Sequence, residues 1–457
     1  MKALLNIGMF LVPPLMAYIL HVGNANRKGG GYDNRRKRRI FLLYMLSVNA
    51  CTYLVSCARG IKTFSFEQMT ISYRVKYMGL GVAFGLFFWF VSSRTRSVKH
   101  DAEQRNYELD FLKFIFTICV FMSHTGVFRK ENTNIILPPQ FGQVSVFFFF
   151  VVSGMLMANS ILKKQINTTE YGKLAVVFVI NKIKVLAGDV YAALFVFMAV
   201  YIFTIPLNKI PGELVKMVPE LFFVTRAGIS ITYNVPGWYL SAMFLAMLPL
   251  AYLLYRNRDF TLHILAPILA VFILGWLCQT NDYCFPDQHK MHGLFLGGMY
   301  SAVSGLCFGI CAYNIYIRLC KAGINENGRM LLTATEAFLY GVFFGTWFLL
   351  RNNRMIMSAI LLLPVAAAIT FSGKSYITGL FQFKWMKYLA PVSLTIYLNQ
   401  WIGRVLVQKY FAERSYGFCV SMMAFITLCS CLLSTLTKRI SKYVWKEKLK
   451  TVFTNCV

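Results

Sequence analysis

The sequence predicts an all-α protein, a polytopic membrane helical bundle of about 13 transmembrane helices. Two compositional observations and one physical argument lead to this prediction. Of the 457 residues, 57% are hydrophobic and only 14% are charged. Apolar runs of about 20 residues, long enough to cross a ~30 Å hydrocarbon core as helices, recur from end to end. Because a backbone in lipid finds no water, each run must satisfy its own hydrogen bonds as a helix.

The expected spans follow one another along the whole chain. They cover residues 3–22, 40–58, 77–93, 109–128, 143–162, 186–205, 236–255, 261–278, 293–317, 331–350, 355–372, 386–408 and 417–437. The polar stretch 94–108 separates the first three spans from the other ten. We therefore predict a three-helix membrane extension with a basic loop at 1–100, a ten-helix membrane core at 101–440 and a basic tail at 441–457.

The formal net charge of +29 bears on partners and on orientation. In a soluble protein it would suggest nucleic acid, but basic loops also hold the helix ends of membrane proteins in the cytoplasm. With an odd number of spans the termini lie on opposite sides, and Lys and Arg are in roughly twofold excess on the side of the C-terminus. We expect membrane lipid as a partner, no nucleic acid, and a cytoplasmic C-terminus.

The 12 cysteines lie mostly inside apolar runs and are typical of small buried residues. No Cys or His spacing indicates zinc, so no metal is expected. Cys278 and Cys284 fall six residues apart near an outer loop. A disulfide between them is left open, because its geometry cannot be judged from sequence.

The fourth span carries the polar residues that point to chemistry. Asp110, Lys113, Thr117 and His124 fall within a sector of about 60° on a helical wheel. Charged residues inside a span are costly and mark function by default. Lys113 and His124 are about 16 Å apart along the helix, so they can contact two ends of one long ligand. Two plain alternatives stay open: a local ion pair of Asp110 with Lys113, and an interhelical hydrogen bond of His124.

Four stretches together resemble acyltransferase family 3, the membrane O-acyltransferases that modify bacterial surface polysaccharides and peptidoglycan. Leu109–Lys113 followed by His124 resembles the opening helix of that family. The other matching stretches are QVSVFFFFVVSGM at 143–155, PGWYL at 236–240 and SLTIYLNQ at 393–400. The resemblance covers roughly residues 105–437, and the four stretches occur in the family's order.

The resemblance implies transfer of an acyl group from acyl-CoA, expected to be acetyl-CoA, to a hydroxyl of a cell-surface glycan or its lipid-linked precursor. It also implies a bacterial plasma or inner membrane. His124 would act as general base or as covalent acyl carrier, and both roles stay open. The resemblance assigns further residues: Asp110 and Lys113 beside His124 in catalysis, Lys113, Lys182 and Lys184 for acyl-CoA, and Trp238, Tyr239, Ser153 and Tyr397 for the acceptor.

The chain departs from the family pattern in three places. Lys182 and Lys184 stand where the family has an arginine pair, and lysine supplies charge without the bidentate fork of arginine. Gln400 replaces a late histidine, and Phe147 replaces an acidic residue.

The other matched residues also have plain explanations. Ser153 and Gly154 are a small pair suited to close helix packing. Trp238, Tyr239 and Tyr397 could belong to an aromatic belt at the membrane surface.

Two other classes of function stay open. A transporter or flippase for a glycan or amphiphile would also line its path with intramembrane Lys, Asp and His. The two halves of the chain show no internal repeat of the kind common in transporters. A non-catalytic scaffold of an envelope assembly would need no histidine in the membrane.

Overall fold

The computed structural model describes residues 11–22, 106–128, 141–164, 168–228, 234–281, 285, 287–349 and 353–454, with scattered positions between 37 and 89. Its contacts divide the chain into two compact units. The first unit consists of Met1–Leu112 and Ala312–Lys387, and the second of Lys113–Cys311 and Tyr388–Val457. The boundaries fall inside helices α4 and α12, so each unit takes part of both.

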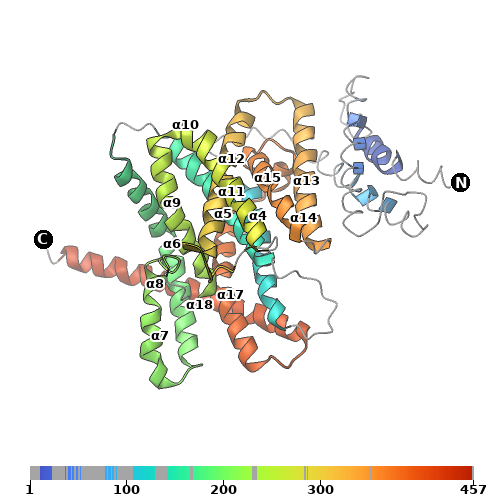
Figure 1. Ribbon diagram of the computed structural model, residues 1–457. Coiled ribbons are helices and arrows are strands. Elements are labelled where there is room, and N and C mark those ends of the chain that lie inside the picture. Colours follow the sequence, from blue (N-terminus) through green and yellow to red (C-terminus); the bar gives the residue numbers. More distant parts are fainter. Residues whose placement is uncertain are drawn as a thin grey trace. The chain divides into compact units, whose positions relative to one another are not determined.

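The second unit is a bundle of long helices joined by short ones. The long helices are α4 (Tyr107–His124), α5 (Phe141–Leu162), α6 (Tyr171–Ile202), α9 (Trp238–Arg256), α11 (Ala266–Thr280), α12 (Gly297–Lys321), α17 (Leu389–Tyr410) and α18 (Tyr416–Thr454). The short elements are η2 (Thr125–Phe128), η3 (Leu207–Lys209), α7 (Ile210–Lys216), α8 (Val218–Leu221), η4 (Val235–Gly237), α10 (Arg258–Phe260), η5 (Thr261–Leu265) and the strands β1 (Met291–His292) and β2 (Phe295–Leu296). Helices α17 and α18 lie side by side, and α6 packs against α9, α17 and α18 (Figure 1).

The first unit contains the remaining helices. They are α13 (Glu326–Leu349), α14 (Asn353–Ile360), α15 (Leu363–Ser372), α16 (Ile377–Leu380) and most of η6 (Lys384–Tyr388). Helix α13 packs on α15 through the buried residues Leu339, Ala366 and Ile369. A further helical stretch, Leu11–Val22, is apolar but short.

The prediction of an all-α membrane protein is confirmed, apart from the two-residue strands of one antiparallel hairpin. Among the described residues, seven helices are long and apolar enough to cross a membrane. They are Tyr107–Phe128, Gly142–Leu162, Tyr171–Ile202, Val235–Arg256, Arg258–Thr280, Gly297–Lys321 and Tyr416–Ser441. The count of 13 is not confirmed, and the predicted spans 40–58 and 77–93 lie largely outside the described residues.

Two predicted spans differ from the helices observed. The span expected at 186–205 is α6, which already begins at Tyr171. Lys182 and Lys184 hid its first half in the sequence, because long basic side chains can lie along a helix while their charges reach polar surroundings. The span expected at 355–372 is two helices, α14 and α15, and α15 starts afresh with Pro364 in its first turn.

Helices α5 and α12 approach each other closely enough for backbone contact. A Cβ atom on Gly154 would lie 2.1 Å from the carbonyl oxygen of Leu306, and one on Gly309 would lie 2.1 Å from that of Val151. No side chain fits at either position. The packing explanation of Gly154 is therefore confirmed, and small residues bring these two helices together as they commonly do in membranes.

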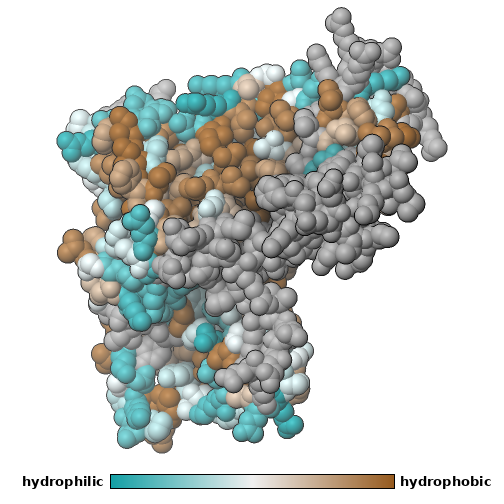
Figure 2. Space-filling model, turned by 45° about the vertical axis from the view of Figure 1, so that its right-hand side comes forward, coloured by the Kyte–Doolittle hydropathy of each residue, from teal (hydrophilic) through white to brown (hydrophobic). Residues whose placement is uncertain are grey.

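The outer surfaces of α11 and α18 are apolar, as contact with lipid requires. Their exposed large side chains recur every three or four residues, which places them on one face of each helix. These residues are Ile264, Ile268, Val271 and Phe272 on η5 and α11, and Phe425, Leu428, Leu432 and Leu436 on α18. Figure 2 shows hydrophobic side chains gathered into areas of this kind on one face of the protein.

Inside the first unit, two carboxyl groups are buried among hydroxyl groups. The Thr378 hydroxyl donates to Glu108 Oε2 at 2.6 Å, and the Thr370 hydroxyl donates to Glu336. Tyr340 Oη lies 3.1 Å from Thr370 Oγ1 and extends this network. Because buried polar groups are normally hydrogen-bonded, these hydroxyl groups stabilise one carboxyl oxygen of each acid in the apolar interior.

Candidate active site

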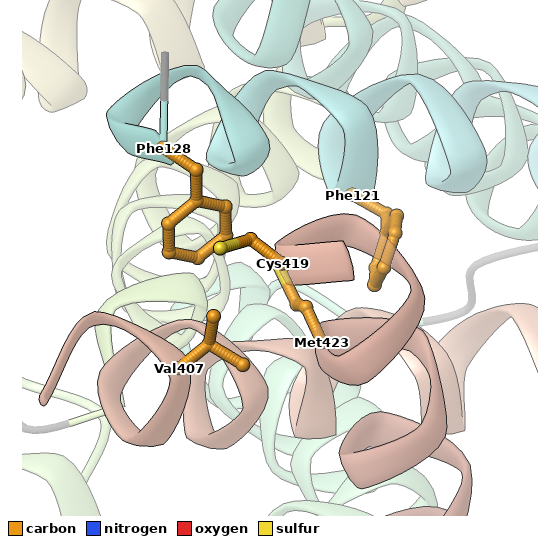
Figure 3. Close-up of a cluster of buried hydrophobic side chains, with 5 residues drawn as sticks. All are labelled: Phe121, Phe128, Val407, Cys419 and Met423. Carbon is orange, nitrogen blue, oxygen red and sulfur yellow. The ribbon is translucent and has the colours of Figure 1, made fainter. Parts of the chain in front are cut away.

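His124 is the last residue of α4, and an apolar cluster holds the turn that surrounds it. Phe121 and Phe128 point toward Val407 of α17 and toward Cys419 and Met423 of α18 (Figure 3). The two phenylalanines lie on either side of His124 in the sequence, so their burial fixes the end of α4 and the start of η2.

Two polar contacts extend this anchoring. Thr117 Oγ1 lies 3.2 Å from Ser393 Oγ of α17, and Thr125 Oγ1 lies 2.8 Å from Tyr416 Oη at the start of α18. Thr117 was predicted to share a face with His124, and the structure turns both toward α17. The backbone that carries His124 is therefore held on two sides.

The His124 side chain lines a cavity of about 320 Å³ within the second unit. Its lining includes His124 of α4, Gln143 of α5, Trp238 of α9, Gln288 and His289 before β1, and Tyr397, Trp401 and Arg404 of α17. The volume lies in the range of small-molecule sites, and the mixture of aromatic walls with a few polar groups is typical of them. We call it the His124 cavity.

The His124 ring lies edge-on to Trp401, with 5.2 Å between ring centres. Its Nδ1 atom is buried and has no hydrogen-bond partner among the residues that the structure describes. The Oε1 atom of Gln400, the residue next to Trp401, is likewise buried without such a bond, and the Gln400 side chain is close enough to interact with the His124 ring. An unmade hydrogen bond of a buried polar atom costs about 1–3 kcal/mol, so a shift of the Gln400 side chain or a ligand in the cavity would stabilise this imidazole.

Three residues of α17 line the cavity from one face of that helix. Tyr397, Trp401 and Arg404 are spaced four and three residues apart, which brings their side chains together. The Arg404 guanidinium carbon lies 4.3 Å from the centre of the Trp401 ring, within the range of a cation–π contact. Arg404 thus brings a positive charge to the cavity beside His124.

Behind this wall, hydroxyl groups hold the aromatic side chains. Tyr397 Oη donates to the carbonyl oxygen of Pro236 at 3.1 Å, and Ser153 Oγ lies 3.0 Å from Tyr239 Oη. Tyr239 and Tyr397 also meet edge to face, with ring centres 5.9 Å apart. The Trp238 ring itself faces the cavity.

A buried arginine lies next to the cavity wall. Arg226, from the segment before η4, is only 1% exposed, and its Nη2 atom lies 3.1 Å from His289 Nδ1. Its guanidinium carbon lies 5.7 Å from the centre of the Trp238 ring. Burial lowers the pKa of Arg226 to about 10, although the nearby Asp287 and Glu220 oppose that shift.

Glu220 of α8 precedes Arg226 in the same connecting region. It is buried and accepts a hydrogen bond from the Asn234 backbone N–H at 3.3 Å. Burial raises its pKa to about 8, against the effects of Asn234 and of Arg226.

The cavity contains only part of the predicted site. His124, Trp238 and Tyr397 line it, whereas Tyr239 and Ser153 lie behind its wall. Lys113, half-buried on α4, is not among the lining residues. Asp110 belongs to the first unit. The roles assigned to all of these residues remain predictions.

Lys182 and Lys184 lie on α6, away from the cavity lining. The Lys182 ammonium group lies 5.5 Å from the centre of the Phe178 ring, and it is near enough to Lys164, two residues after α5, for their like charges to repel. Arg258 donates to the Lys164 carbonyl oxygen at 2.7 Å. A basic region therefore lies at one end of α5 while the other end reaches the cavity, about 30 Å away along the helix.

Sequence reasoning missed four residues of this region: Arg226, Gln288, His289 and Arg404. An arginine inside a predicted span is itself a signal, and Arg404 could have been found from it. Arg226 and His289 come from two separate connecting segments, and no spacing in the sequence relates them.

No group of three or more His, Cys, Asp or Glu within the described ranges could hold a metal ion. A disulfide between Cys278 and Cys284 stays an open question, because Cys284 lies outside the described residues.

Comparison with protein families matches residues 106–437 to an acyltransferase domain. The match includes every helix that lines the cavity. Searches of curated proteins and of solved structures gave no match to this chain.

Proposed function

Because the chain belongs to acyltransferase family 3 and is an acyltransferase in a membrane, we propose that it moves an acetyl group from acetyl-CoA to a hydroxyl of a glycan. The acceptor is a cell-surface glycan or its lipid-linked precursor, and the membrane is a bacterial plasma membrane. The observation that carries this proposal is the His124 cavity, in which the His124 imidazole meets aromatic walls and its Nδ1 atom makes no hydrogen bond of standard geometry within the part of the chain that the structure describes.

The walls of the cavity suit a sugar. Trp238, Trp401 and Tyr397 offer large apolar faces, and Tyr397 is held by its bond to Pro236. Rigid aromatic side chains of this kind present contact area to the C–H faces of a sugar ring. In this proposal Trp238 and Tyr397 touch the acceptor, while Ser153 and Tyr239 act from behind by keeping the wall in place.

The reaction needs a group that handles one proton. The acceptor hydroxyl oxygen attacks the thioester carbonyl carbon, and His124 takes the hydroxyl proton. The carbon–sulfur bond then breaks, and the released CoA thiolate takes that proton, which returns His124 to its neutral form. The alternative is that His124 first receives the acetyl group and passes it to the hydroxyl. In both schemes the imidazole must be neutral at the start.

The donor reaches the cavity from the cytoplasmic side in this proposal. Lys113, Lys182 and Lys184 supply positive charge for the CoA phosphates, and Asp110 lies one turn before Lys113 on α4. Lys113 precedes His124 by about 16 Å along α4, so a flexible thioester arm can run between them. The basic end of α5 and the C-terminus lie in the cytoplasm.

The test is transfer of labelled acetyl from acetyl-CoA to candidate glycans by the purified full-length protein. His124→Ala should abolish transfer, since a general base contributes about 10²–10⁴-fold to rate. Its melting temperature should change little, because a membrane-embedded hydrogen bond is worth only about 0.6–1.7 kcal/mol. His263→Ala, at an exposed histidine of η5, is the matched control. Full transfer by a well-expressed His124→Ala protein would refute the proposal and favour a transporter.

A further inference from the structure

A second histidine in the cavity has one ring nitrogen held by an arginine. Arg226 Nη2 lies 3.1 Å from His289 Nδ1. Arginine has five N–H donors and no acceptor, so Nδ1 must accept this bond. His289 is therefore neutral, and its only ring proton is on Nε2.

Arg226 is fixed in position and remains charged. Its backbone N–H donates to Ser241 Oγ at 3.0 Å, and its guanidinium faces the Trp238 ring. A pKa of about 10 still leaves the guanidinium protonated at neutral pH. Arg226 therefore always donates to His289 Nδ1. A proton on Nδ1 would bring two N–H groups into contact, one from His289 and one from Arg226, which is unfavourable.

The Nε2 side of His289 belongs to the cavity wall. The Gln288 Nε2 atom lies 3.3 Å from His289 Nε2, and both residues line the cavity. Because His289 Nε2 carries the proton, it cannot accept from that amide N–H, so the Gln288 amide must turn about its last bond to place its oxygen there. At 3.3 Å between two nitrogen atoms the contact is long for a hydrogen bond, so an oxygen atom of a substrate can take the place of the amide.

We propose that His289 is a second catalytic residue, whose Nε2–H donates a hydrogen bond to the acyl carbonyl oxygen as that oxygen becomes negative. This inference rests on the proposed acyl transfer at His124. When the acceptor oxygen bonds to the carbonyl carbon, the carbonyl π electrons move to oxygen, and the Nε2–H bond strengthens without giving up its proton. When the carbon–sulfur bond breaks, the carbonyl forms again.

The two histidines therefore divide the work according to their partners. His124 has no partner on Nδ1 among the described residues and can take up a proton. His289 has an arginine on Nδ1 and can only donate from Nε2. In this arrangement Arg226 is a positioning residue, because it acts on the reaction through His289.

Substitution by glutamine separates these roles, because a glutamine side chain keeps an N–H donor but cannot take up a proton. His289→Leu should lower kcat by about 10²–10³-fold, the usual effect of losing one oxyanion donor, with KM for acetyl-CoA unchanged. His289→Gln should recover most of that loss, whereas His124→Gln should stay inactive. His263→Gln, at the exposed histidine, is the control for the substitution itself.

A measurement on the folded protein removes the dependence on activity. Nitrogen NMR of ¹⁵N-histidine-labelled protein, with the His289 signals identified by their loss in His289→Gln, should show a neutral ring protonated on Nε2. In Arg226→Met no arginine donates to Nδ1, so the His289 signals should show a mixture of rings protonated on Nδ1 and on Nε2. A His289 ring protonated on Nδ1 would overturn the inference, whatever the kinetics.

The two proposals fail in different ways. Full activity of His124→Ala would refute the proposed function, and the tautomer of His289 would be unaffected. An inactive His124→Ala together with wild-type kcat in a folded His289→Leu protein would overturn only the role of His289. A rise in the acceptor KM with unchanged kcat in His289→Leu would also overturn it, because the residue would then bind the acceptor and not the oxyanion.

Discussion

Helix α5 is packed in two different ways along its length. Near its start, Gln143 and Val146 face the His124 cavity. Two turns later, Val151 and Gly154 lie against the backbone of α12 with no room for a side chain. The same helix thus has an open half and a closed half.

The difference shows how a bundle in lipid can hold a cavity. Helix association in a membrane has no hydrophobic driving force and relies on close packing and hydrogen bonds. The glycine contact between α5 and α12 supplies close packing on one side of α5. On the other side, aromatic and polar side chains of α9 and α17 line a cavity of about 320 Å³.

The closed half should be the most sensitive to a small change in volume. Gly154→Ala adds one methyl group where a Cβ meets Leu306 at 2.1 Å, so we expect a loss of stability of about 3 kcal/mol or more. Gly275→Ala is the matched control, since Gly275 lies on exposed α11 with open space around it. There the same change should stabilise by up to about 1 kcal/mol. The measurement is the melting temperature of each variant in detergent. An equal fall in both variants would mean that Gly154 is no more tightly packed than Gly275.

The open half should respond in activity and not in stability. Gln143→Trp places an indole in the cavity, and we expect transfer to fall by about 10²-fold because the acceptor loses its reactive position. The melting temperature should stay near that of the wild type. Val176→Trp adds the same side chain to the exposed surface of α6 and should leave transfer unchanged. Normal turnover by Gln143→Trp would mean that the acceptor does not occupy the His124 cavity.

The sequence predicted the features that lie within single helices. The polar face of α4 follows from helical periodicity, and the structure turns two of its members, Thr117 and His124, toward α17. The small pair Ser153–Gly154 predicted close packing, because a residue without a side chain in an apolar span has few other uses.

Features built from distant segments could not be predicted in this way. Arg226 and His289 are 63 residues apart in sequence, and only the tertiary fold brings them to one hydrogen bond. The partner of Gly154, the backbone of Leu306, has no sequence signal because any residue has a carbonyl oxygen. The start of α6 was also not predicted, because Lys182 and Lys184 made its first half too polar to be recognised as part of an apolar span.

Helix α4 allows a comparison of its own, between its cavity end and the end near Lys113. Lys113→Ala should raise KM for acetyl-CoA by about 10–100-fold, as expected for one lost charge-assisted bond of about 1.5–3 kcal/mol. Lys113→Arg should retain most activity, because the charge remains and the family motif allows either residue. Steady-state kinetics over a range of acetyl-CoA concentrations distinguishes KM from kcat. If both variants bind donor as the wild type does, Lys113 serves only as a partner of Asp110.

The smallest expected effect falls at the residue beside the glycine contact. Ser153→Ala removes the bond to Tyr239, and we expect a loss of stability of about 0.6 kcal/mol, the mean for hydrogen bonds inside membranes. Tyr239→Phe should cost a similar amount. The double variant should cost less than the sum of the two, because one bond is lost in each case. Acceptor KM should stay close to that of the wild type in Ser153→Ala, since Ser153 lies behind the cavity wall and not in it. Additive losses of stability, or an acceptor KM raised tenfold, would instead place Ser153 in contact with the acceptor and extend the open half of α5 by two turns.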